Sequence, residues 1–129
     1  MSDDAFLTRV RERGEYTSRE EAAVVSHAVL AVLAQHLGRE GAGRIVSWLP
    51  DRLAKTVSAS GAAKAEGLGA EEFCGRVAGH TGVRPRTPQW DIHAVLSTVA
   101  GVLSPAERAV FRSRLPHGLM PLLDPEPPG

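Results

Sequence analysis

Residues 18–37 read SREEAAVVSHAVLAVLAQHL and decide the fold. Apolar residues recur in this stretch at spacings of three and four, which is the period of an amphipathic α-helix. The positions are Ala22, Val25, Val29, Leu33 and Leu37. Further alanines and valines widen the stripe until only a narrow polar face is left, so we expect a helix that is covered on several sides.

The centre of this helix occurs twice in the chain. His27-Ala28-Val29-Leu30 returns as His93-Ala94-Val95-Leu96, and further pairs follow at the same offset of 66 residues. They are Ala34 with Ala100, Leu37 with Leu103, Leu49-Pro50 with Leu115-Pro116, and Leu53 with Leu119. Most of these are core or helix-breaking positions, so the sequence predicts a duplicated packing unit.

The repeat predicts an all-α protein made of two tandem three-helix repeats, each with a short extra helix after Leu-Pro. We place repeat one at residues 3–57, a small-residue linker at 58–69 and repeat two at 70–123. Residues 124–129, with three prolines, are expected to be a disordered tail. Half of this chain buries too little surface to be stable alone, so residues 1–129 should form one helical domain with pseudo-twofold symmetry.

Capping and breaking residues set the expected helix boundaries. Ser18 and Ser104 are each followed three residues later by glutamate, the spacing of a capping box. Gly38 should end the first long helix. The next helix should end before Pro50, and a further short helix can begin at Pro50.

Composition restricts the possible partners and compartment. Lysine plus arginine and aspartate plus glutamate both number 15, so nucleic-acid binding is not expected. Cys74 is the only cysteine, which is typical of a reducing cytoplasm and excludes an internal disulfide. Because no run of 18 apolar residues and no leader pattern is present, we predict a cytoplasmic protein with no membrane association.

These patterns resemble a known family. A Phe-x-x-Arg-Val motif, then Ala-Val-Leu, then Leu-Pro-x-x-Leu, each given twice in the same order, is similar to the bacterial family called domain of unknown function 2267. The resemblance covers residues 4–123. It implies an all-helical duplicated fold, and it brings no established activity and no catalytic residues. Histidine stands before Ala-Val-Leu in both copies, where we expect a charged or small polar residue in many members.

His27 and His93 are the most distinctive polar residues of the repeat. If a pseudo-axis ran near the middle of both long helices, the two rings could face each other and bind a metal, share a proton or act as a pH switch. Two histidines are too few for a closed zinc site, and neither has a partner at His-x-x-x-His spacing. We therefore expect satisfied or partly exposed helix histidines, and no metal or other cofactor.

A partner surface is the second candidate. Arg108, Arg112 and Arg114 make the second half basic, whereas the first half carries more acid, which favours self-association over DNA binding. Trp48 has Arg114 as its counterpart in the repeat, so the duplicated core needs no aromatic residue there. Trp48 either anchors a partner or covers the linker.

Without a site motif, we predict a non-catalytic helical module that binds a protein partner or a second copy of itself, with no catalytic residues. The alternatives are a small-ligand, metal or nucleic-acid binding protein, or an enzyme without a recognisable motif. Cys74 follows Phe73 on an amphipathic helix and is expected to be a small core residue rather than a nucleophile.

Overall fold

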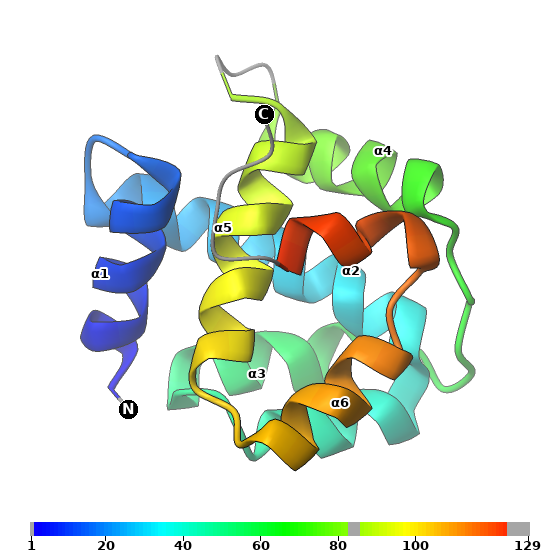
Figure 1. Cartoon of the computed structure of the whole chain (residues 1–129). Helices are drawn as coiled ribbons and strands as arrows, with labels where there is room; N and C mark the ends of the chain where they lie inside the picture. Colours follow the sequence, from blue (N-terminus) through cyan, green and yellow to red (C-terminus); the bar gives the residue numbers. More distant parts are fainter. Residues whose placement is uncertain (1, 83–85, 124–129) are drawn as a thin grey trace.

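The computed structural model describes residues 2–82 and 86–123, and every regular element in these ranges is a helix (Figure 1). This confirms the all-α prediction. The predicted tail at 124–129 lies outside the described residues. The helices are α1 (Asp3–Gly14), α2 (Arg19–Val46), α3 (Asp51–Ser60), α4 (Ala70–Thr81), α5 (Pro88–Gly101), α6 (Pro105–Ser113) and the 3-10 helix η1 (His117–Leu123).

The predicted caps begin the helices, with one difference. At α6 the box is complete, because the Ser104 hydroxyl accepts from Glu107 N–H and the Glu107 carboxylate accepts from Ser104 N–H. At α2 the Ser18 hydroxyl accepts from Glu21 N–H as expected. The Glu21 carboxylate accepts from Thr17 N–H instead, with 3.1 Å between the nitrogen and the oxygen.

Gly38 breaks α2 where the sequence predicts, and the chain continues as helix without an intervening loop. Its backbone has φ +75° and ψ 178°, a conformation that is essentially restricted to glycine. A Cβ at this position would lie 2.5 Å from the backbone nitrogen of Ala65. The kink and the close approach of the linker therefore both require Gly38.

Helix α3 continues to Ser60, three residues into the segment 58–69, and the Gly61 N–H donates to the Val57 carbonyl at its end. The rest of the linker is held on the body of the protein: Gln35 O accepts from Glu66 N–H, and the Arg76 guanidinium donates to both Gln35 and Glu66.

Two helices form the centre of the molecule. Helices α2 and α5 contact each other, and α1 and α4 each lie against both of them, with α1 and α4 on opposite sides of α5 in Figure 1. Helix α3 packs on α2, and η1 packs on α5. The repeated Ala-Val-Leu residues at 28–30 and 94–96 are all buried, and all of them except Ala28 belong to one hydrophobic core, so the two halves share their interior.

Helix α2 also has the length and apolarity that a membrane span needs. In the apolar stretch of 18 residues that meets these requirements, 61% is buried inside the protein. The kink at Gly38 also interrupts the helix. The central helix of a globular fold has the same properties, so this helix is weak evidence for a membrane location.

Candidate functional site

Helix α6 is attached to the body of the protein at few points. Phe111 is its only buried residue, and the Phe111 ring meets the Trp48 ring edge to face at a centroid distance of 6.3 Å. The Arg108 side chain donates to the carbonyl of Ala100 near the end of α5 and to that of Leu103 just after it. The outer faces of α6 are consequently exposed on both sides of this attachment.

One side of α6 faces the second half of α2 across an open groove, which we call the α6 groove. Its volume is about 510 Å³. It is lined by Gly43, Arg44, Ser47, Trp48, Ala106, Glu107 and Val110. Val110 is 41% exposed, and it is one of two large hydrophobic side chains classed as exposed among the described residues. Trp48 is half-buried, so it both covers Phe111 and borders the groove.

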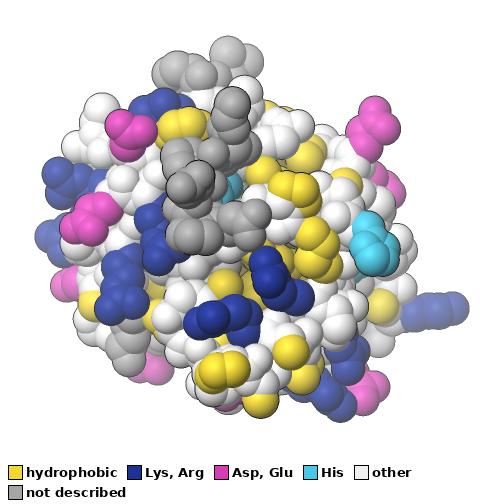
Figure 2. Space-filling model, in the orientation of Figure 1, with side chains coloured by type: hydrophobic (Ala, Val, Ile, Leu, Met, Phe, Trp, Pro, Cys, Tyr) yellow, Lys and Arg dark blue, Asp and Glu magenta, His cyan; other side chains and the backbone are white. Residues whose placement is uncertain are grey.

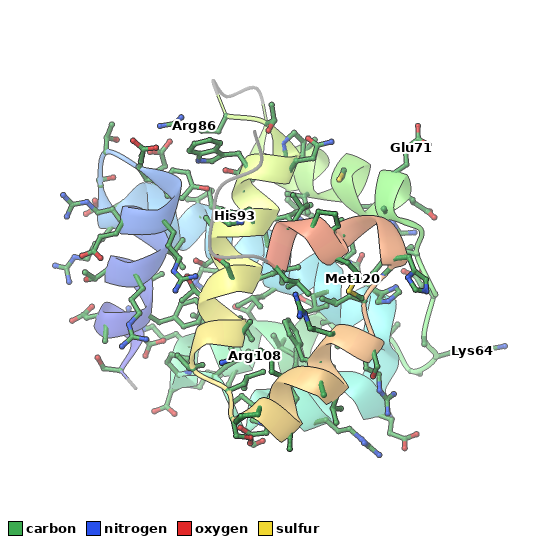
Figure 3. The ribbon with its side chains drawn as sticks, viewed as in Figure 1. Lys64, Glu71, Arg86, His93, Arg108 and Met120 are labelled. Carbon is green, nitrogen blue, oxygen red and sulfur yellow. The ribbon has the colours of Figure 1, made fainter. Side chains whose placement is uncertain are left out.

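The other side of α6 borders a more enclosed hollow, which we call the arginine cavity. Its volume is about 300 Å³. It is lined by Arg13, Ser97, Ala100, Gly101, Arg108, Arg112 and Leu123. Figure 3 shows Arg108 between the end of α5 and the start of α6, and Figure 2 shows basic side chains over α1 and α6 on this face.

The predicted partner surface is thus divided by α6. Arg108 and Arg112 lie on the side of the arginine cavity, whereas Trp48 and Arg114 lie together on the other side, around a small apolar gap at Phe111. The carbonyl of Arg114 also lies 2.7 Å from His36 Nε2, which ties the end of α6 to α2. The Trp48 ring packs on Phe111 of α6.

The two repeated histidines have equivalent surroundings in their own halves. His27 Nδ1 lies 2.6 Å from the Thr56 hydroxyl on α3, and His93 Nδ1 lies 3.0 Å from the Leu122 carbonyl on η1. Each partner is 29 residues further along the chain. His27 is half-buried and His93 is 1% exposed. Each ring is therefore oriented by the last helix of its own half.

The next features are the metal-binding side chains and the thiol of Cys74 in the described part of the chain. There, no group of three or more His, Cys, Asp or Glu side chains is placed to hold a metal ion. Cys74 is half-buried beside α5 and η1, and burial raises the pKa of its thiol above the ordinary value. The neutral thiol is the favoured form at neutral pH, which is unfavourable for a nucleophile.

Arg13 and Ser97 are the residues of the arginine cavity that sequence reasoning missed. Arg13 follows Val10 by three residues and so continues the buried stripe of α1. That spacing was the available signal. Ser97 lies within an apolar helix and carried no signal, because its exposure to a cavity depends on how α1 and α6 pack around α5.

The described residues form an all-helical protein with one hollow on each side of α6. The sequence matches the family model described as uncharacterized conserved protein (DUF2267) over residues 3–122, and the chain belongs to that family. Comparison with curated proteins gives no match.

Proposed function

We propose that this protein is a non-catalytic interaction module that binds a protein segment in the α6 groove. The observation that carries the proposal is the position of Val110, an exposed apolar side chain that borders the same groove as half-buried Trp48. An aromatic side chain beside an exposed apolar one is typical of the centre of a protein interface. The proposal involves no catalytic step.

Charge at the groove suggests what kind of segment binds. Arg44 lines the groove and Arg114 lies just beyond Trp48, whereas Glu107 is the one acidic residue among the described lining residues. A segment that offers an apolar side chain next to carboxylates fits this arrangement. Such a segment comes from a protein partner or from a second copy, whose first half carries the exposed carboxylates of Asp4 and Glu20.

We also infer that the two halves arose by duplication of one unit. Three observations support this: the kinked helix α2 occupies the place in the first half that α5 and α6 occupy in the second, Leu-Pro precedes both α3 and η1, and the two histidines have partners at equal spacing. The packing of α1 and α4 on both central helices is also what a pseudo-twofold arrangement would give.

The test compares two exposed valines. Val110→Glu places a charge in the α6 groove, and Val24→Glu places the same charge on α2, where Val24 is 53% exposed. Sedimentation velocity over a range of concentrations measures self-association, and affinity capture from the native host with mass spectrometry identifies a partner. We expect Val110→Glu to weaken the association about tenfold or more and Val24→Glu to leave it unchanged. Equal behaviour of the two variants would contradict the proposal.

A further inference from the structure

The arginine cavity brings three guanidinium groups to one hollow from two helices that are far apart in the sequence. Arg13 comes from α1, and Arg108 and Arg112 are one helical turn apart on α6. The Arg13 guanidinium lies close over the end of α5, because a Cβ on Gly101 would be 3.3 Å from its terminal nitrogen. The described lining residues include three arginines and no carboxylate.

The fold itself does not require polar groups at these positions. In the first half, the residues 66 positions before Ser97, Arg108 and Arg112 are small or apolar. They are Ala31, Ala42 and Val46. The corresponding helices pack with these aliphatic residues, so the polar character of the cavity walls that α5 and α6 form is a property of the second half.

The wall of the cavity contains an unsatisfied polar group. Ser97 is 2% exposed, and its buried hydroxyl oxygen has no hydrogen-bond partner. A buried hydroxyl without a partner is costly, and such groups in native proteins are usually explained by strain, an unseen water or a ligand. Alanine at this position would avoid the cost, as Ala31 does in the first half.

Arg13 is held in a setting that disfavours its own charge. Burial and, to a lesser extent, the neighbouring Arg9 lower the pKa of its guanidinium below the ordinary value. An arginine remains protonated even so, and an anion in the cavity would offset this unfavourable interaction. Arg108 uses its Nε and one terminal nitrogen for the α5 carbonyls, which leaves the other terminal nitrogen available to a ligand among the described groups.

We propose that the arginine cavity binds the phosphate group of a small phosphorylated molecule or free inorganic phosphate. Guanidinium groups donate paired hydrogen bonds in a plane that matches phosphate oxygens, and several of them around one hollow favour a dianion over a single carboxylate. A hydroxyl donor such as that of Ser97 can complete the oxygen contacts. The volume of about 300 Å³ is at the lower end of the range for small-molecule sites.

The experiment titrates the full chain with inorganic phosphate and, separately, with glycerol phosphate by isothermal calorimetry at constant ionic strength. We expect saturable binding of both probes. Tighter binding of inorganic phosphate would identify the free ion as the source, and equal or tighter binding of glycerol phosphate would identify a phosphorylated small molecule. Thermal stability alone is a weaker readout, since phosphate stabilises most proteins by exclusion from their surfaces.

The variants separate the cavity from general charge. Arg112→Gln and Arg13→Gln each remove one guanidinium from the cavity and should weaken binding about tenfold. Arg114→Gln removes the same charge from the other side of α6 and should leave the affinity unchanged. Ser97→Ala copies the first half, so it should fold normally and weaken binding about threefold to fivefold.

The pH dependence gives an independent check. A phosphate monoester gains its second charge at a pKa of about 6, so the affinity for glycerol phosphate should rise between about pH 5.5 and 7.5. Sulfate carries two charges throughout and should show no such rise. The described groups that face the cavity from α1, α5 and α6 are arginines, which stay charged over this range, and Ser97, which does not titrate.

Three outcomes would overturn the proposal. The first is that the wild-type chain shows no saturable binding, and the second is that Arg114→Gln loses as much affinity as Arg112→Gln. The third concerns Asp124 and Glu126, which follow Leu123 in the sequence and lie outside the described residues. If only the Asp124→Asn, Glu126→Gln double variant binds phosphate, the arginines serve the chain's own carboxylates and not a phosphate ligand.

Discussion

At the scale of single residues, Gly38 carries the sharpest requirement. We expect Gly38→Ala to lower the free energy of unfolding by about 2 kcal/mol or more, because alanine strains the backbone there and its Cβ meets the Ala65 nitrogen. Gly43→Ala is the matched control, since a Cβ at Gly43 meets nothing within 4 Å and alanine favours the helix. Urea denaturation of both variants measures the difference. A loss in Gly38→Ala no larger than in Gly43→Ala would show that the kink is not needed.

The structural roles of single residues such as Gly38 could be predicted from the sequence only in part. The break at Gly38 was predictable, because glycine follows a long apolar run and ends it. The contact with Ala65 was not, since it depends on where the linker returns 27 residues later. The position of Asp91 was not predictable either. It is buried at 1% exposure and accepts a hydrogen bond from the Tyr16 hydroxyl, which lies 75 residues earlier in the sequence.

At the scale of elements, this hydrogen bond joins α5 to the segment that follows α1. The Tyr16 hydroxyl lies 2.5 Å from the Asp91 carboxylate, and the Trp90 ring nitrogen donates to Gly14 O at 2.7 Å beside it. Tyr16→Phe keeps the ring and removes the donor, so we expect a loss of about 1–3 kcal/mol in the free energy of unfolding. Thermal unfolding checks the value. Thr17→Val, at an exposed neighbouring position, serves as the control and should cost less.

Element boundaries were mostly predictable because they rest on local chemistry, as at Ser104 and Pro50. The packing of α6 against the other helices was not predictable. The same repeat position holds Ile45 in the first half and Phe111 in the second, and both are buried. The cavity on one side of α6 and the groove on the other arise from arginine, valine and alanine residues whose neighbours come from other helices.

At the scale of the whole molecule, the shared core makes each half depend on the other. Helix α1 lies against α5 of the second half, and α4 lies against α2 of the first. Val29 and Val95 are both fully buried in the one hydrophobic cluster. The repeated sequence predicted which residues are buried, whereas the cross-packing of α1 and α4 follows only from three-dimensional arrangement.

This dependence predicts a single unfolding transition, which the two tryptophans can report separately. Trp48 lies in the first half and packs on Phe111 of the second, so the fluorescence of the Trp90→Phe chain reports on the first half and its contact with α6. Trp90 lies in the second half and bonds Gly14 of the first, so the Trp48→Phe chain reports on the second half and its contact with the end of α1. Within each of these chains, we expect the fluorescence midpoint in urea to coincide with the midpoint of helix loss by circular dichroism.

Val29→Asp or Val95→Asp, added to either chain, should lower the free energy of unfolding by about 3–5 kcal/mol, because an unpaired carboxylate is buried. Each substitution should lower the fluorescence midpoints of both halves. Two separated transitions, or a Val29→Asp effect confined to the Trp48 signal, would mean that the halves fold independently.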